Sequence, residues 1–397
     1  MGTDNEAAAG ATGSRWYHRI GPGLITACVV IGPGSILSSS NVGAVNGFSL
    51  NWVVLAAVVF MMVYTTLGAK LGVMASKSTG DLVAERAGRW LAVLIGLSVF
   101  FISAAFQFGN NLGVHYAFQV YFNDFQYTVL IFNGISLAFL FGFRNLYKAL
   151  ERLMMLFVGL MLISFALNLT FAQIRNPSLG ELLRGFVPDL QGKLGKDDLL
   201  TVLALIGTTF VITAAYYQSY LVRQKGWGRA ELKSGMLDAR VGAVLMALIT
   251  LMILSTAATV LRGEALEDVR QVAAQLKPLF GEWGQGLFCL GLFSAAYSSF
   301  LVNSMIGGFI LSDGLGLGSK PTDLAPRLLT AAVLLTGMGV ALYVIFVGAK
   351  PVTAIVAAQA VTVVAAPLAA GVLLWLTNQE DIMGDQRNGK IVNLLAG

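Results

Sequence analysis

The sequence predicts an all-α protein that crosses a membrane many times, and three observations support this prediction. Of its 397 residues, 56% are hydrophobic and only 12% are charged, whereas soluble domains carry about 25% charged residues. Apolar stretches of roughly 20 residues, the length that crosses a bilayer, recur along the whole chain. The first of these stretches contains Gly32-Pro33-Gly34-Ser35, a run that breaks helices.

Ten membrane spans are expected, in chain order, from the apolar stretches. They lie near residues 20–45, 50–74, 92–122, 127–146, 153–174, 199–222, 239–261, 284–312, 326–349 and 352–377. The first 14 residues are small and polar and lack the basic-then-apolar order of a signal peptide, so we expect a disordered tail there.

The break at Gly32-Pro33-Gly34-Ser35 is the most informative feature of the first span. Proline has no N–H to donate, and the freed backbone groups would have no partners in lipid. The break must therefore face protein or a polar cavity. Secondary transporters build their binding sites at mid-membrane depth from helices interrupted in this way.

The distribution of basic residues predicts the orientation of the chain. If the N-terminus is cytoplasmic, 18 of the 26 Lys and Arg fall on the inner side and 8 on the outer side. The positive-inside rule then places both termini in the cytoplasm and the protein in the inner (plasma) membrane. No basic stripe with interleaved aromatics indicates nucleic-acid binding. Cys28 and Cys289 lie within spans and are expected to be packing residues.

Several segments resemble the Nramp family of divalent-metal transporters. At the N-terminal end they are the opening GPG at 21–23, FSLNWVVL at 48–55, AKLGV at 69–73 and GDLVAE at 80–85. At the C-terminal end, Gln359, Pro367 and the run from Thr377 to Ile382-Met383-Gly384 are similar to the tenth span and its exit.

The resemblance implies the leucine-transporter (APC superfamily) fold, with two inverted five-helix repeats in which spans one and six are broken. Repeat one would cover about 20–174 and repeat two about 199–377, within a transporter domain at 15–378. Residues 379–397 would form a cytoplasmic tail or the start of an eleventh span, which family members often carry.

The metal-binding motifs of the family are altered in this chain. The first-span motif Asp-Pro-Gly-Asn reads Gly32-Pro33-Gly34-Ser35 here, and Met-Pro-His of the sixth span corresponds to Val211, Ile212 and Thr213. A span-ten glutamine corresponds to Ala365, although Gln359 remains. These changes remove the thioether and carboxylate ligands that select transition metals. A fully dehydrated divalent ion would then lose many kcal/mol of hydration without compensation.

The remaining candidate ligands are hydroxyls and backbone carbonyls. They suit a hard cation that keeps some water, such as magnesium, or a metal that arrives with its own ligands. Ser35 and Thr213 are the candidate metal ligands. The full set of expected substrate-binding positions is Val29, Gly32, Ser35, Thr208, Thr209, Val211, Thr213 and Gln359.

Proton coupling is expected to be absent. The acidic pair of the family's third span corresponds to Gln107 and Asn110, and its sixth-span histidines correspond to Thr213 and Gln218. Amides and hydroxyls do not titrate near neutral pH, whereas an intramembrane proton relay needs groups that do. We find no Asp or Glu in the middle of any span, and Asp313 is expected to be a solvated charge at a helix end.

Polar and aromatic residues of the spans leave alternatives open. Gln107, Asn110, Asn111 and His115 share one helical face and form either a hydrogen-bonded helix seam or the wall of an aqueous path. Tyr216 and Tyr217 form a gate or cavity wall, or belong to an interfacial belt. The further candidates for cavity lining are Tyr297 and Ser298.

The sequence thus favours a transporter or facilitator of a metal ion in hydrated or chelated form, with iron or magnesium ahead of manganese and without proton coupling. The alternative is a carrier of a small neutral organic solute such as an amino acid. A receptor or scaffold is a third hypothesis. An enzyme is least expected, because no nucleophile–base pair or cofactor motif is present. The partners expected are the lipid bilayer and the transported metal ion or chelate, for a monomer without a cofactor.

Overall fold

In the part of the chain that the computed structural model describes, six helices are long and apolar enough to cross a membrane. They are α3 (Asn51–Met74), α5 (Arg89–Gln119), α7 (Leu146–Arg175), α11 (Leu232–Val260), α12 (Val269–Gly314) and α13 (Leu324–Val347). The structure describes residues 21–122, 127–143, 145–188, 196–263, 266, 269–347 and 366–397. In this described part of the chain all regular structure is helical, as predicted.

The other predicted spans are broken or short. Helices α1 (Pro22–Val30) and α2 (Pro33–Asn46) form one span bent by 58°. Helices α9 (Lys196–Thr209) and α10 (Ile212–Lys225) are two halves with a break between them. Helix α6 (Thr128–Gly142) and a helix over Ala366–Thr377 complete the order. Residues 352–365 of the predicted tenth span lie outside the described part.

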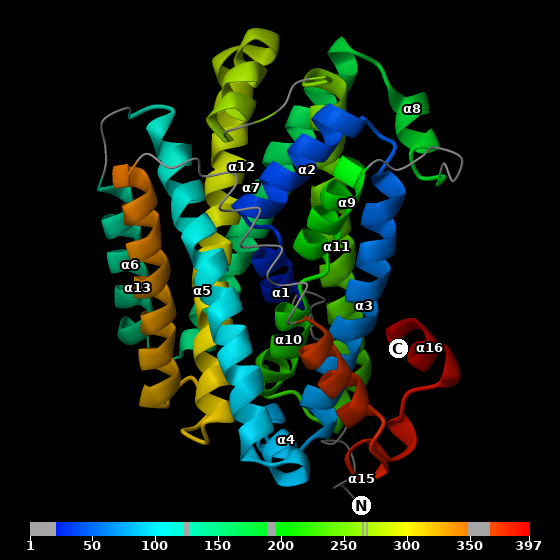
Figure 1. The fold of residues 1–397 in the computed structure, drawn as a ribbon, viewed down its shortest axis with the longest axis vertical. Helices are drawn as coiled ribbons and strands as arrows, with labels where there is room; N and C mark the ends of the chain where they lie inside the picture. The colour runs from blue at the N-terminus through cyan, green and yellow to red at the C-terminus, as the bar shows by residue number, and fades with distance from the viewer. Residues whose placement is uncertain are drawn as a thin grey trace, which may run out of the picture.

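The two ends of the bundle are marked by short helices (Figure 1). One end carries α4 (Thr79–Ala87) and α15 (Glu380–Met383), and we call it the α4 end. The opposite end carries α8 (Leu179–Arg184). Two 3₁₀ turns, η2 (Arg229–Glu231) and η3 (Gly384–Gln386), and α16 (Lys390–Ala396) complete the described elements. The C-terminal α16 contacts α3, where Tyr64 Oη donates to Ala396 O at 2.6 Å.

The broken helix α1–α2 lies in the middle of the bundle, between α5 and α12 on one side and α3 and α11 on the other (Figure 1). All nine residues of α1 are buried. Its main chain touches that of α11, because a Cβ on Gly23 would lie 2.1 Å from Asp238 O and one on Gly242 would lie 2.3 Å from Gly23 O. Only glycine fits at these two positions without moving backbone.

A buried carboxylate holds the free end of α1. Asp238 of α11 is 1% exposed and accepts hydrogen bonds from Gly21 N at 2.7 Å and Gly23 N at 2.6 Å. These amides belong to the first turn of α1, where an anion is stabilised by unpaired N–H groups and by the helix dipole. Asp238 was not foreseen, because the predicted seventh span begins only at residue 239.

A second buried carboxylate corrects an expectation. Asp313, expected to be a solvated charge, is 2% exposed at the end of α12. It accepts hydrogen bonds from Ser78 Oγ at 2.6 Å, Gly80 N at 2.7 Å and Tyr220 Oη at 2.5 Å. The prediction was wrong because the N-terminus of α4, with Ser78 and Gly80, and Tyr220 of α10 cover the end of α12 and supply three donors in place of water.

Candidate functional site

The first helix break begins where the α1 hydrogen-bond ladder fails. Gly32 N donates to Val30 O at 3.1 Å and therefore not to Cys28 O, four residues back. Pro33 has no N–H, so Val29 O loses its helical donor as well. Two carbonyls at the C-terminal end of α1 are thus released from the helix, and α2 starts again with Pro33 in its first position.

The second break separates α9 from α10. The ladder of α9 continues to Phe210, whose N–H donates to Ile206 O at 2.7 Å. Val211 is non-helical, with φ −90° and ψ 88°, and its carbonyl accepts from Ala214 N and Ala215 N at the start of α10. No proline or glycine stands at this break, so its position could be inferred only from the resemblance of 207–213 to the family motif.

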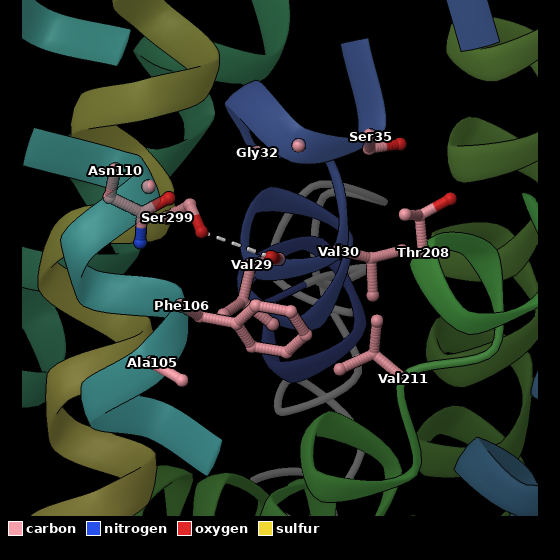
Figure 2. A pocket seen from close by; sticks show the side chains of 12 residues that line it. Val29, Val30, Gly32, Ser35, Ala105, Phe106, Asn110, Thr208, Val211 and Ser299 are labelled. Atoms are coloured by element: carbon pink, nitrogen blue, oxygen red, sulfur yellow. Dashed lines mark hydrogen bonds between the residues drawn. The ribbon is translucent and has the colours of Figure 1, made fainter. Parts of the chain in front are cut away.

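The two breaks meet at one small cavity. Figure 2 shows side chains from both breaks, from α5 and from α12 arranged around it. The lining residues are Val29, Val30, Gly32, Gly34, Ser35, Ala105, Phe106, Gly109, Asn110, Thr208, Val211 and Ser299. None of these twelve carries a charge, so the cavity offers only neutral oxygens, an amide and apolar surface.

The polar groups of the cavity differ in how they are satisfied. Ser35 Oγ is buried and has no hydrogen-bond partner among the described residues. Thr208 Oγ1 donates to Leu205 O at 3.0 Å. Ser299 Oγ donates to Val29 O at 3.1 Å, across the cavity edge (Figure 2). Because an unsatisfied buried hydroxyl costs free energy, Ser35 is the group most ready to bind a polar ligand.

The space beside Gly32 is already filled by oxygen atoms. A Cβ built on Gly32 would lie 3.1 Å from Ser299 Oγ and 3.2 Å from Asn110 Oδ1. In the Nramp motif that residues 32–35 resemble, the first-span carboxylate stands at this position. Here α12 and α5 bring neutral oxygens to the same place, so the loss of the carboxylate leaves a polar surface instead of a hole.

The structure brings together five of the eight expected substrate-binding residues: Val29, Gly32, Ser35, Thr208 and Val211 all line the cavity. Thr209 and Thr213 lie outside this lining. Both are buried, and their hydroxyls have no partner among the described residues. Gln359 lies outside the described residues.

Three of the four expected proton-pathway positions, Gln107, Asn110 and Gln218, take part in buried polar contacts. Asn110 Nδ2 donates to Gln107 Oε1 at 3.3 Å, and Asn303 Nδ2 of α12 lies 3.4 Å from the same oxygen. The side chain of Gln218 hydrogen-bonds Thr26 of α1. These amides join α5 to α12 and α10 to α1, as interhelical amides do in membrane proteins.

The residues expected as possible cavity lining lie outside this cavity. Asn111 accepts from Asn133 Nδ2 of α6 at 2.6 Å, and His115 is buried on the same helix. Tyr297 stacks on Phe293, with ring centroids 5.7 Å apart. The remaining three, Tyr216, Tyr217 and Ser298, are fully buried between helices.

Sequence reasoning did not predict Phe106, Gly109 or Ser299 as lining residues. Phe106 and Gly109 precede Asn110 by four residues and one residue, on the face of α5 that turns toward the break. Helical spacing from Asn110 was the available signal for Phe106, four residues away, but not for Gly109, which is its direct neighbour in the chain. Ser299 was one of several neighbouring serines, and no local pattern distinguished its face of α12.

Helices broken at mid-length around a shared cavity define a membrane transporter of the leucine-transporter fold. A solved structure of MhsT in complex with L-phenylalanine matches with a TM-score of 0.60 and 16% identity, over 97% of this chain and 95% of that one. A structure of the Eremococcus coleocola manganese transporter matches with a TM-score of 0.81 and 17% identity, over 96% of this chain and 83% of that one.

A family model described as natural resistance-associated macrophage protein-like (Nramp) matches residues 23–397. The chain therefore belongs to the Nramp family, as the sequence motifs indicated, and is a multi-pass membrane protein. It is 28% identical to the divalent metal cation transporter MntH of Deinococcus radiodurans, over 96% of this chain and 88% of that protein.

Proposed function

We propose that this protein carries a divalent metal ion across the plasma membrane, in partly hydrated or chelated form and without proton coupling. Its curated relatives are named divalent metal cation transporters, which supports the class of substrate. The observation that carries the finer proposal is the uncharged lining of the cavity at the two breaks. Such a lining fits a cation that keeps part of its water.

The chemistry of the lining favours hard ions over soft ones. Ser35 Oγ and the carbonyls beside the breaks are hard oxygen donors, whereas the cavity has neither a thioether nor a carboxylate. Among the described residues, no group of three His, Cys, Asp or Glu side chains comes close enough to hold a metal. Magnesium retains water readily, and iron can enter as a chelate, so both rank ahead of manganese.

The groups at the family's acidic positions support the proposal that proton coupling is absent. Gln107 and Asn110 hydrogen-bond each other and cannot release a proton near neutral pH. The buried carboxylates of the described part, Asp238 and Asp313, lie at the α4 end and already accept backbone and side-chain donors.

A small neutral organic solute such as an amino acid is the second candidate. The first turn of α2 borders the cavity, and its unpaired N–H groups favour a negative or carboxylate group. Phe106, Val30 and Val211 provide an apolar wall for a side chain. A bare cation gains nothing from either feature.

Purified protein in liposomes separates the two candidates. Uptake of Mg²⁺, Fe²⁺, Mn²⁺, a ferric chelate and a set of neutral amino acids is measured with and without a pH gradient. We expect metal or chelate uptake whose rate does not change with the gradient. Amino-acid uptake without metal uptake would support the second candidate, and acceleration by an inward proton gradient would contradict the absence of coupling.

A further inference from the structure

A groove at the α4 end of the bundle is lined by three basic side chains. Lys148 and Arg152 belong to the first two turns of α7, and Lys225 is the last residue of α10. Glu151 is the one acidic residue of the lining. Three positive charges and one negative charge give the groove a net charge of +2.

The cation of α10 is held in place and partly neutralised. Lys225 Nζ is 2.8 Å from Glu151 Oε1 and lies over the Trp227 ring, 4.6 Å from its centroid. The side chains of Lys225 and Glu151 are only 12% and 20% exposed. Lys225 therefore gives the groove one ammonium group in a fixed position, unlike a surface lysine that moves freely in water.

The two cations of α7 lack a partner of opposite charge. Lys148 and Arg152 are exposed, and neither forms an ion pair with a described residue. They stand four residues apart, so their side chains are neighbours on one helix face, where like charges repel each other. An anion bound between them would remove this repulsion.

The start of α7 adds further groups that favour an anion. The first turn of a helix carries unpaired N–H groups and partial positive charge. Asn145 Oδ1 accepts from Lys148 N at 3.1 Å, so the amide of Asn145, which also lines the groove, keeps its NH₂ as a donor. Phosphate oxygens accept from such donors and pair well with the planar guanidinium of arginine.

The face of α7 that carries these two cations continues as an apolar surface. Met155, Ile163 and Ile174 follow Arg152 along this face, and all three are exposed. From residue 152 to residue 174 the helix rises about 33 Å, at about 1.5 Å per residue. This length matches the hydrocarbon core of a bilayer, which is about 30 Å thick. Arg152 therefore lies at the level of the lipid headgroups, directly beside a surface that faces acyl chains.

We propose that this groove binds the headgroup of an anionic phospholipid, such as phosphatidylglycerol, in the leaflet at the α4 end. The phosphate lies between Lys148, Arg152 and Lys225, and an acyl chain lies along the apolar face of α7. Basic pockets between membrane helices bind anionic lipid headgroups. A soluble phosphate would use the same cations but gain nothing from the apolar face, which favours the lipid.

The bound lipid braces the start of the broken helix. A Cβ on Gly21 would overlap Glu151 Oε1 and lie 2.5 Å from Lys225 Nζ, so the chain enters α1 directly against this ion pair. A phosphate that holds Lys225 together with two residues of α7 joins α10 to α7 at this point. The lipid thus stabilises the folded arrangement around the first turn of α1.

Lipid binding is measured on the purified protein in neutral detergent. Native mass spectrometry gives the affinity for dioleoylphosphatidylglycerol, and Tm is followed as this lipid, dioleoylphosphatidylcholine or inorganic phosphate is added at equal concentration. A ligand that binds the folded state raises its stability. We expect phosphatidylglycerol to raise Tm more than phosphatidylcholine does, and inorganic phosphate to leave it unchanged.

Two pairs of substitutions test the groove itself. Lys148→Gln/Arg152→Gln should weaken phosphatidylglycerol binding at least tenfold and remove most of the rise in Tm. The matched control Arg229→Gln/Lys233→Gln also removes two exposed cations four residues apart, but outside the groove, and should bind like the wild type. Should the first variant fold poorly, Lys148→Gln and Arg152→Gln replace it singly, each with at least threefold weaker binding.

The lipid proposal is overturned if phosphatidylglycerol raises Tm no more than phosphatidylcholine does, or if the groove variant binds like the wild type. Equal weakening in the control variant would also overturn it, because general attraction to a charged lipid would then explain the binding. A full response to inorganic phosphate would assign the groove to a soluble anion instead. No transported substrate is present in these measurements, so their outcome is independent of the proposed function.

Discussion

Gly32 and Ser299 face each other across the first helix break, and a Cβ on Gly32 would lie only 3.1 Å from Ser299 Oγ. The hydroxyl therefore occupies the space into which the side chain of any other residue at 32 must grow. This contact ties the identity of residue 32 on one helix to that of residue 299 on another. A carboxylate introduced at residue 32 by changing the first span alone would therefore be crowded by Ser299 Oγ.

Restoring the family motif with Gly32→Asp and Ser35→Asn should raise Mn²⁺ affinity at least tenfold, which corresponds to about 1.4 kcal/mol. A carboxylate offsets the desolvation of the ion, which neutral oxygens do only weakly. We expect a larger gain when Ser299→Ala is added, because the Oγ that crowds residue 32 is then removed. Mn²⁺ titration calorimetry measures each step. Equal affinities for the double and triple variants would contradict the steric relationship.

Replacing Ser35 by alanine should slow metal uptake about five- to tenfold, the usual effect of losing one neutral hydrogen bond. Tm should not fall, because Ser35 Oγ has no partner among the described residues. Ser39→Ala is the matched control: it removes a buried hydroxyl of α2 that likewise has no described partner and lies outside the cavity. Equal loss of uptake in both variants would mean that the cavity lining is irrelevant.

Asp238→Asn should loosen the α4 end of α1. In the wild type, Gly21 N and Gly23 N each donate to one oxygen of the Asp238 carboxylate. The asparagine amide has only one acceptor oxygen, so its NH₂ group would face one of these two N–H donors. Cys28 of α1 is fully buried and reports on this motion. In a Cys289→Ser background, its alkylation by N-ethylmaleimide should be at least tenfold faster in Asp238→Asn. The exposed ion-pair variant Asp381→Asn should react like the wild type, and an unchanged rate in Asp238→Asn refutes the prediction.

Asp313→Asn should lower the free energy of unfolding by about 2 kcal/mol or more, since hydrogen bonds to a charged group contribute about 1.5–3 kcal/mol each. Its carboxylate joins α12 to α4 and to Tyr220 of α10. Thermal unfolding in detergent measures the loss. The control Asp81→Asn changes a half-exposed carboxylate of α4 that is paired with Arg89. Exposed ion pairs contribute less than about 1 kcal/mol, so the control should lose less than that in its free energy of unfolding. Comparable losses in the two variants would show that burial of Asp313 is unimportant.

The α4 end should be cytoplasmic, as the distribution of Lys and Arg predicts. Single-cysteine variants at exposed positions test this orientation: Lys77→Cys at the α4 end and Leu183→Cys in α8. In intact cells, a membrane-impermeant maleimide should label only the variant with Leu183→Cys. Labelling of the Lys77→Cys variant alone would reverse the orientation.

Features with a local cause could be predicted from the sequence. The spans follow from apolar length, and the first break follows from Pro33, which has no N–H. The second break has no such residue, since Phe210 and Val211 are ordinary helix residues in composition. Its position came only from the resemblance to the family, because tertiary packing overrides local propensity there.

Features that depend on contacts between distant segments could not be predicted. Asp313 looked like a solvated helix end because nothing near residue 313 shows that Ser78 and Gly80 cover it. The same holds for Ser299, whose role depends on which face of α12 meets Val29. Helical periodicity indicates which residues share a face and leaves open what that face meets.

The contact between Gly23 and Gly242 has a mechanical consequence. Backbone lies directly on backbone there, and the Asp238 carboxylate of α11 holds Gly21 N and Gly23 N beside this contact. A smooth surface of this kind resists sideways motion little and can close again in the same register. Asp238, more than the glycine contact, therefore ties the first turn of the half-helix to its neighbour.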